Sequence, residues 1–140
     1  SPACEWAWVT GGEPTVHDLG PLFTALRRAG FKVALATAGV RPLTDRPDFL
    51  SVSPHNLDSS WIVRGGDQCN LVPGLNGLTL DDIEAADRAG AFGRFRERWV
   101  TPAWYGGNGT TGNVAECAAF VARRPGWRLG IQAHKAWGVA

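Results

Sequence analysis

The sequence predicts an α/β protein built on a parallel sheet, and three observations support this prediction. Segments rich in β-forming residues alternate with amphipathic helical segments along the chain. The segment "KVALAT" (32–37) is almost wholly apolar, which is typical of a strand buried on both faces. The chain of 140 residues contains no repeat or linker that would separate domains. Alternating strands and helices form parallel sheets with right-handed crossovers, so we predict a single domain over 1–140.

The first half of the chain supplies three predicted strands and one helix. "EWAWVT" (5–10) is a strand of β-forming residues that stops at glycines. The helix at 17–30 has an apolar face and ends at a glycine suited to a C-cap. After the strand at 32–37, "DFLSVS" (48–53) predicts another strand. The segment 54–77 is rich in Gly and Pro and is interpreted as loop. The apolar face of the first helix comprises Leu19, Leu22, Phe23 and Leu26.

The second half continues the alternation. A helix is predicted at 79–90, with Thr79 as N-cap and Asp81 and Asp82 at its positive end rather than as paired catalytic acids. A short strand at 98–101 follows. A helix at 113–124 begins with a capping-box spacing of Asn113 and Glu116, and its stripe includes a core Cys117. The last predicted strand is 127–133.

Composition narrows the function classes. Apolar residues make up 44% and charged residues 19% of the chain, so we expect a folded core rather than disorder. The formal net charge of +1 does not favour nucleic-acid binding. No apolar run approaches the roughly 20 residues of a membrane span, and the start lacks a signal-peptide pattern. We therefore expect a cytoplasmic protein with neither a membrane nor a nucleic acid as partner. Because the chain begins with Ser and lacks Met, we expect it to be processed or cut from something longer.

Polar and Gly/Pro residues follow every predicted strand. The carboxyl ends of parallel strands meet at one edge of the sheet, where ligands bind in α/β folds. We therefore predict a ligand site there. The segments that follow the strands are 10–14, 37–39, 53–55, 101–102 and 132–135.

The turn "TGGEP" (10–14) is the most suggestive of these segments. Two glycines expose backbone N–H and C=O groups at a strand end, where they could bind a ligand carrying both an amine and a carboxylate. Glu13 supplies negative charge and Pro14 stiffens the turn. A tight strand-to-helix turn that needs positive φ is the alternative interpretation.

Five segments, in order, resemble one family. "TGGEP" resembles the amine-binding motif of radical S-adenosylmethionine enzymes, and "RLGIQAHKAWGVA" resembles the C-terminus of 7-carboxy-7-deazaguanine synthases. "KVALATAG", "LSVSPH" and "WVTPAW" resemble three segments between them. The resemblance implies a partial (βα) barrel of the radical S-adenosylmethionine type.

The resemblance also implies an activity. The family uses a [4Fe-4S] cluster, S-adenosyl-L-methionine and Mg²⁺ to convert 6-carboxy-5,6,7,8-tetrahydropterin to 7-carboxy-7-deazaguanine, a lyase reaction that feeds queuosine biosynthesis. We expect a small-molecule pterin substrate and a homodimer. The resemblance implies no catalytic residue and no metal ligand in this chain.

By the same resemblance, one set of residues would hold the cofactor and another the substrate. The cofactor set is Gly11, Gly12, Glu13, Pro14, Thr37, Ser53, Pro54, His55, Thr101 and Pro102. The substrate set is Thr10, Gln132, His134, Lys135 and Ala140.

The chain departs from the family at several positions. The family carries three clustered cysteines before the GGEP strand, whereas only Cys4 precedes it here, and Cys69 and Cys117 lie elsewhere. Ala36, Ala38, His55 and Thr101 replace the family's Glu, Asn, Lys and Gln. We expect the later part of such an enzyme, with the N-terminal βα unit and the cluster loop missing and with no radical activity alone. A cluster-less module that binds S-adenosylmethionine or a nucleotide, and half of a split assembly, are the alternatives.

Other patterns carry less weight. Gly107, Gly109 and Gly112 have dinucleotide-fingerprint spacing, but no acid follows about 20 residues on. The three histidines lack zinc-ligand spacing. Trp104 and Trp137 could stack on a pterin or adenine, with core packing as the alternative.

Overall fold

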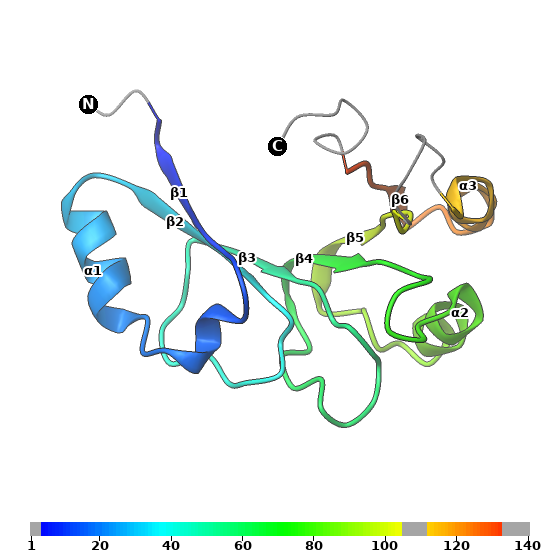
Figure 1. Ribbon diagram of the computed structural model, residues 1–140, viewed down its shortest axis with the longest axis horizontal. Coiled ribbons are helices and arrows are strands. Elements are labelled where there is room, and N and C mark those ends of the chain that lie inside the picture. Colours follow the sequence, from blue (N-terminus) through cyan, green and yellow to red (C-terminus); the bar gives the residue numbers. More distant parts are fainter. Residues whose placement is uncertain (1–3, 105–111, 133–140) are drawn as a thin grey trace.

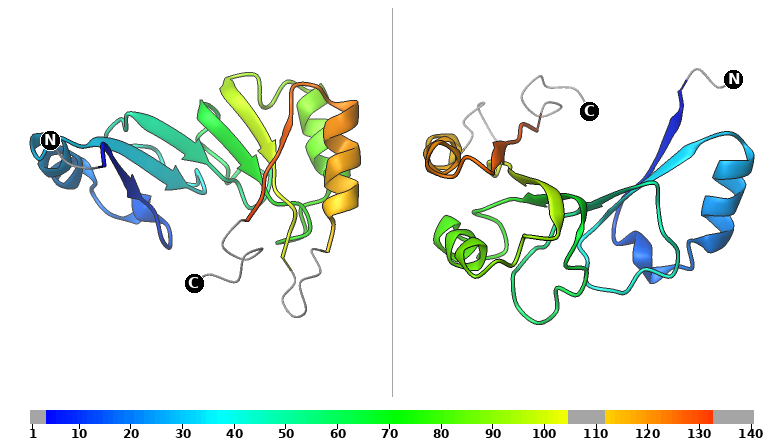
Figure 2. Two further views of the ribbon diagram at one scale, coloured as in Figure 1. Left: turned by 90° about the horizontal axis from the view of Figure 1, so that it is seen from above. Right: turned by 180° about the vertical axis from the view of Figure 1, so that it is seen from behind.

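A computed structural model describes residues 4–104 and 112–132. Its strands form one sheet in which every pairing is parallel and the strands follow chain order, from β1 to β6. Figures 1 and 2 show the sheet curved, with α1 beside one flank and α2 and α3 beside the other. The elements are β1 (Trp6–Val9), η1 (Pro14–Val16), α1 (Gly20–Arg28), β2 (Lys32–Thr37), β3 (Phe49–Val52), β4 (Gly66–Leu71), α2 (Leu80–Arg88), β5 (Phe95–Val100), α3 (Val114–Arg123) and β6 (Arg128–Leu129).

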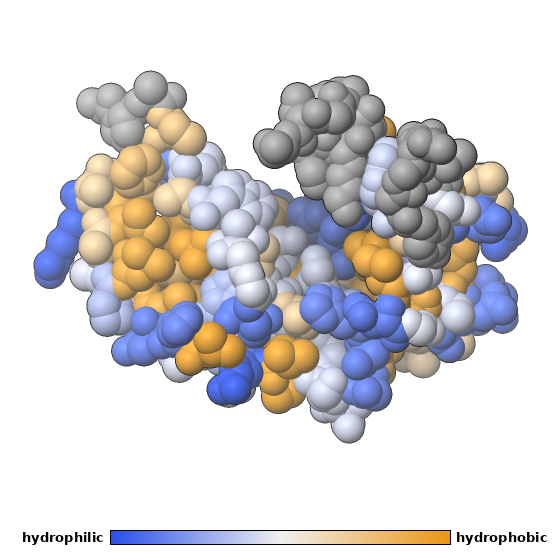
Figure 3. Space-filling view, in the orientation of Figure 1, coloured by the Kyte–Doolittle hydropathy of each residue, from blue (hydrophilic) through white to orange (hydrophobic). Residues whose placement is uncertain are grey.

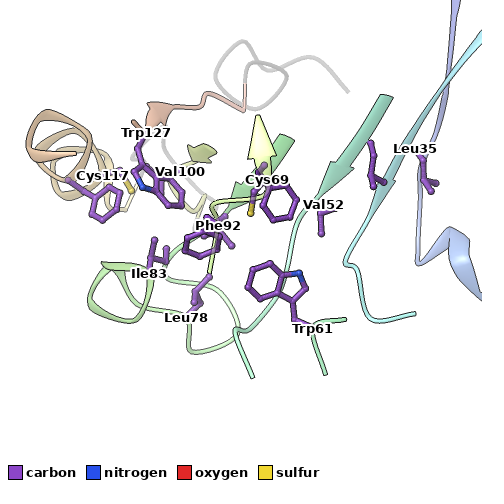
Figure 4. Packing of buried hydrophobic residues seen from close by; sticks show 14 of the residues in the cluster. Leu35, Val52, Trp61, Cys69, Leu78, Ile83, Phe92, Val100, Cys117 and Trp127 are labelled. Carbon is purple, nitrogen blue, oxygen red and sulfur yellow. The ribbon is translucent and has the colours of Figure 1, made fainter. Parts of the chain in front are cut away.

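The hydrophobic core lies between the sheet and the helices. Phe23 of α1, Ile83 of α2 and Phe120 of α3 are fully buried and belong to one cluster with strand residues. Figure 4 shows part of this cluster, including Ile83 and Cys117. Burying one such side chain contributes about 2 kcal/mol, so this cluster contributes strongly to the stability of the fold. In the part of the chain that the structure describes, the opposite side of the sheet carries no helix, and we call it the open face.

Two helix ends follow the sequence prediction and one does not. The Thr79 hydroxyl accepts from the Asp82 N–H at 3.1 Å, and the Asp82 carboxylate accepts from the Thr79 N–H at 3.0 Å, a complete capping box. Gly30 follows α1 with a φ of +90°. Asn113 is the N-cap residue of α3 as predicted, but the predicted side-chain cap is wrong, because this side chain instead accepts from Ala103 N–H at 2.9 Å and donates to Pro73 O at 2.7 Å.

The interpretation of 54–77 as loop is also wrong in part. Residues 66–71 form β4, which lies between β3 and β5 in the sheet. Its sequence, "GDQCNL", alternates polar residues with Cys69 and Leu71, because only one face of the strand meets the core. Over the described residues the sheet therefore has six strands, where the sequence predicted five.

Aspartates complete the hydrogen bonding at the amino ends of two strands. The Asp48 carboxylate accepts from the Val33 N–H at 2.8 Å, and the Asp67 carboxylate accepts from the Leu50 N–H at 2.9 Å. Asp48 therefore links the start of β3 to β2, and Asp67 links the start of β4 to β3. Among the described residues, each helix is too short or too polar to cross a lipid bilayer.

Candidate functional site at the carboxyl ends of the strands

The predicted site residues that the structure describes lie in segments that end or follow the parallel strands. Thr10 to Pro14 follow β1, Thr37 ends β2, and Ser53 to His55 follow β3. Thr101 and Pro102 follow β5, and Gln132 follows β6 by three residues. Because all the pairings are parallel, these segments share one edge of the sheet, which we call the rim. His134, Lys135 and Ala140 lie outside the described residues.

Glu13 makes the densest set of contacts at the rim. One carboxylate oxygen accepts from the hydroxyls of Thr15 and Thr37, both at 2.6 Å, and from the Thr15 N–H at 3.1 Å. The other oxygen accepts from the Ala38 N–H at 2.8 Å. Partial burial raises the pKa of Glu13, but the hydrogen bonds from Thr15, Thr37 and Ala38 outweigh it, and the net pKa lies below the usual value. The carboxylate thus stays ionised and joins the ends of β1 and β2.

Thr37 continues this connection to the next strand. Its hydroxyl donates to Glu13 and accepts from the Gly39 N–H at 3.0 Å, and its carbonyl accepts from the Ser53 N–H at 2.8 Å. Thr37 is buried, with 4% of the residue exposed, so these partners replace water around its hydroxyl. The chain segments after β1, β2 and β3 are therefore held in a fixed arrangement.

We call the hydrogen bonds of Glu13 to Thr15, Thr37 and Ala38 the Glu13 clamp. Beside it, Gly11 and Gly12 leave their backbone without side chains. Both are exposed, and a β-carbon placed on either would meet no atom within 4 Å. Gly11 has a φ of +94°, which favours glycine, but packing within the protein does not explain Gly12. Pro14 is buried at the first turn of η1. The arrangement leaves the turn open to close approach by a ligand.

The segment after β3 lines a small cleft. Ser53, Pro54 and His55 share a cavity of about 120 Å³ with Asn70 and residues after β4. Pro54 is buried and His55 is exposed. The cleft opens near the turn that Glu13 fixes, because the Ser53 backbone is bonded to Thr37.

The ends of β4, β5 and β6 are joined by Thr101. Its hydroxyl donates to the Asn70 side-chain oxygen at 2.7 Å, and its N–H donates to Leu71 O at 2.8 Å. Gly130 packs so closely that a β-carbon there would collide with Thr101 Oγ1. Thr101 therefore supports this end of the rim structurally.

Gln132 lies beside a second, mostly apolar cavity of about 240 Å³, with Pro102 and Trp104 among its lining residues. The side-chain oxygen Oε1 of Gln132 is buried and has no hydrogen-bond partner within the described residues. A buried carbonyl oxygen of this kind is costly unless a donor meets it. The amide is therefore placed to accept a hydrogen bond.

Sequence reasoning missed a polar wall on the open face. The register places Gln68 beside Glu97, and Trp99 between Asn70 and Arg128. Trp99 Nε1 donates to Glu97 at 3.0 Å, and the Arg128 guanidinium lies 5.6 Å from the Trp99 ring centroid. In "GDQCNL" the polar Gln68 and Asn70 alternate with the buried Cys69 and Leu71, and this pattern is the signal that could have found the open-face side of β4. Figure 3 shows a hollow at the top, between the two flanks of the molecule.

The cysteines do not fit an iron–sulfur cluster in the described part of the chain. Cys69 and Cys117 are fully buried on β4 and α3, while Cys4 is exposed. Burial raises the pKa of Cys69 to about 12, and burial together with the Glu116 charge raises that of Cys117 to about 11. Cluster ligands are thiolates that lie together. Among the described residues, no group of three His, Cys, Asp or Glu side chains is placed to hold a metal ion.

A comparison with models of protein families finds no match. Comparisons with individual proteins do find similar sequences. The chain is 30% identical over 135 residues to the 7-carboxy-7-deazaguanine synthase of Synechocystis sp. (strain ATCC 27184 / PCC 6803 / Kazusa), covering 94% of this chain and 61% of that protein. It is 32% identical over 126 residues to the 7-carboxy-7-deazaguanine synthase of Burkholderia multivorans (strain ATCC 17616 / 249), covering 90% of this chain and 55% of the relative.

A solved structure agrees with these relatives. The fold matches the crystal structure of QueE from Escherichia coli with a TM-score of 0.69 and 25% identity, covering 94% of this chain and 58% of that one. The predicted resemblance and the predicted α/β partial barrel are confirmed. The chain spans less than two thirds of the length of these relatives.

Proposed function

We infer that this chain carries the S-adenosylmethionine- and pterin-binding part of a 7-carboxy-7-deazaguanine synthase. The similarity over more than nine tenths of the chain to the Synechocystis enzyme supports this proposal. The observation that carries it is the Glu13 clamp, which presents the open backbone of Gly11 and Gly12 at the rim. The enzyme as a whole would convert 6-carboxy-5,6,7,8-tetrahydropterin to 7-carboxy-7-deazaguanine for queuosine biosynthesis.

In this proposal the cofactor binds at the β1–β3 side of the rim. Backbone carbonyls at Gly11 and Gly12 would accept from the amine of S-adenosylmethionine, and the segment 53–55 would line its other side. Thr37, Thr101 and Pro102 would shape the rim rather than react. Glu13 is a positioning residue, because all four of its hydrogen bonds go to Thr15, Thr37 and Ala38.

The substrate would bind on the open face towards β4–β6. A pterin is a flat heteroaromatic ring with hydrogen-bonding edges, which suits an aromatic face flanked by amides and a carboxylate. Trp99, Gln68 and Glu97 supply these groups on neighbouring strands. Thr10 and Gln132, at the ends of β1 and β6, would complete the site, together with His134, Lys135 and Ala140 beyond the described residues.

The radical reaction of the whole enzyme would require an iron–sulfur cluster and a Mg²⁺ ion. A [4Fe-4S] cluster would supply the electron that cleaves S-adenosylmethionine, and Mg²⁺ would assist the substrate. Neither group has ligands among the described residues, so we propose that the chain alone binds ligands without catalysing the reaction. The same observation favours the second candidate, a cluster-less module that binds S-adenosylmethionine. We also propose that the protein works in the cytoplasm as a homodimer, which sedimentation equilibrium can test for its subunit number.

Calorimetry tests the proposed function. The chain should bind S-adenosylmethionine and, separately, 6-carboxy-5,6,7,8-tetrahydropterin. Glu97→Gln should weaken pterin binding about tenfold and leave S-adenosylmethionine binding unchanged, because it alters only the open-face wall. Glu116→Gln, an exposed change on α3, is the matched control. Absence of S-adenosylmethionine binding would refute both candidates, whereas its binding without pterin binding would favour the cluster-less module.

A further inference from the structure

A second cleft lies at the edge of the sheet opposite the rim. It has a volume of about 760 Å³ and is lined by residues that precede or begin β3, β4 and β5. Four arginines line it: Arg46, Arg64, Arg94 and Arg96. The formal net charge of the whole chain is only +1, so this concentration of cations is local.

Most of the guanidinium groups retain free donors. Within the described residues, the side chains of Arg46 and Arg94 make no hydrogen bond or ion pair, and both residues are exposed. Arg96 lies 3.4 Å from an Asp67 oxygen, and its side chain is 82% exposed. Arg64 donates to Trp61 O at 2.8 Å and to Asp58 O at 3.2 Å, with its guanidinium over the Trp61 ring. The cleft can therefore offer several charge-assisted hydrogen bonds to one ligand.

The carboxylates in the cleft do not balance these charges. Asp67 accepts from the Leu50 N–H at 2.9 Å as well as lying near Arg96. Asp45 accepts from the Arg46 N–H at 2.8 Å and lies 4.0 Å from an Arg27 nitrogen outside the cleft. Four arginines against two aspartates leave two net positive charges in the lining. An anion would relieve the repulsion among them.

One wall of the cleft is apolar. Leu43, Ile62 and Val63 contribute to it, and Ile62 is 51% exposed. A bare phosphate would not use this wall, whereas a ligand with a flat organic part would. The volume is within the range of about 300–1,000 Å³ that is typical of small-molecule sites.

We propose that this cleft is a second ligand site, which binds a nucleoside triphosphate with its phosphates on the arginines and its base against the apolar wall. It is separate from the rim, because its residues lie at the amino ends of the strands. It goes beyond the proposed function and does not depend on it. A ligand here would contact the starts of β3, β4 and β5, the strands whose other ends form the rim.

Calorimetric titration with ATP tests this proposal. ATP should bind, and Arg46→Ala and Arg94→Ala should each weaken it about tenfold. Neither side chain has a partner within the described residues, so neither variant should disturb the fold. Arg28→Ala removes the same charge from an exposed position on α1 and should change nothing. No ATP binding at about 1 mM, or equal loss in all three variants, would overturn the proposal.

Two competition arms identify the ligand class and the site. Inorganic triphosphate should bind more weakly than ATP, since it leaves the apolar wall uncovered. Equal affinity would overturn the nucleotide assignment in favour of a polyphosphate anion. Saturating S-adenosylmethionine should leave ATP binding unchanged, and displacement of ATP would place it at the rim and overturn the second site. The same samples report S-adenosylmethionine binding, so a failure of the proposed function is distinguished from a failure of this proposal.

Discussion

The hydroxyl of Thr37 donates a 2.6 Å hydrogen bond to the carboxylate of Glu13, so that the end of β2 is fixed to the turn that follows β1. The same carboxylate oxygen binds Thr15, and the other binds the Ala38 N–H. One acidic side chain thus determines the shape of a glycine turn that has little packing of its own.

The Glu13 carboxylate should make stability depend on pH. Its pKa is lower in the folded chain than the ordinary value of 4.5. The unfolded chain therefore binds a proton first as the pH falls, and the contribution of Glu13 is complete above the unfolded pKa and is lost as the pH falls through the folded pKa. Glu13→Gln should lose less stability than wild type between about pH 5 and pH 3. Urea unfolding at several pH values measures the free energy of unfolding of both proteins. If that free energy fell equally with decreasing pH in the wild type and in Glu13→Gln, the prediction would be contradicted.

Thr37→Val should destabilise the fold by about 1–3 kcal/mol, because it removes the acceptor of the Gly39 N–H and one of the four hydrogen bonds of Glu13. Thr24→Val is the matched control, since Thr24 is exposed on α1. Denaturant midpoints compare the two variants. A loss no greater than that of the control would show that the hydroxyl is not a structural link.

Gly39→Ala should cost about 2 kcal/mol or more. Its φ is +74°, and a β-carbon there would lie 2.7 Å from Val52 Cγ1. Gly90→Ala separates strain from crowding, because Gly90 has a φ of +79° and open space around it. We expect about 1 kcal/mol for that variant. Thermal unfolding compares the stability of the two variants. Equal losses of stability in Gly39→Ala and Gly90→Ala would argue against the crowding beside Val52.

Of the three cysteines, only Cys4 should react rapidly with a thiol reagent in the native protein. Cys69 and Cys117 are fully buried, with pKa values raised to about 12 and about 11 by burial, aided at Cys117 by Glu116. The thiolate is the reactive form, so both should react only after unfolding. A colorimetric thiol titration with and without denaturant checks this. Fast reaction of Cys69 in the native state would contradict the burial of β4.

The sequence predicted the elements whose signals are local. "KVALAT" is almost wholly apolar because β2 is covered on most of its length, and Thr79 forms a cap with Asp82. The rim was predictable because parallel strands align their ends. The resemblance of five segments pointed to the same family that the comparisons show.

Features that depend on distant partners were missed. Asn113 has the spacing of a cap, but its side chain bonds to Ala103 and Pro73, which only the folded chain brings near. The strand β4 looks like loop because Gln68 and Asn70 face the open side of the sheet, where polar residues are stable beside water. Glu97 and Trp99 also lie on the open face, so their proposed part in binding the pterin became visible only in the folded chain.

The affinity of the Glu13→Gln variant for S-adenosylmethionine, measured by calorimetry, tests the central claim most directly. The amide keeps the shape of the side chain but replaces one acceptor oxygen with a donor that faces other donors. With Glu5→Gln as an exposed control near the start of β1, we predict a loss of about tenfold or more for Glu13→Gln and none for Glu5→Gln. Equal affinity of the Glu13→Gln variant and the wild-type chain would contradict the claim that this clamp shapes the cofactor site.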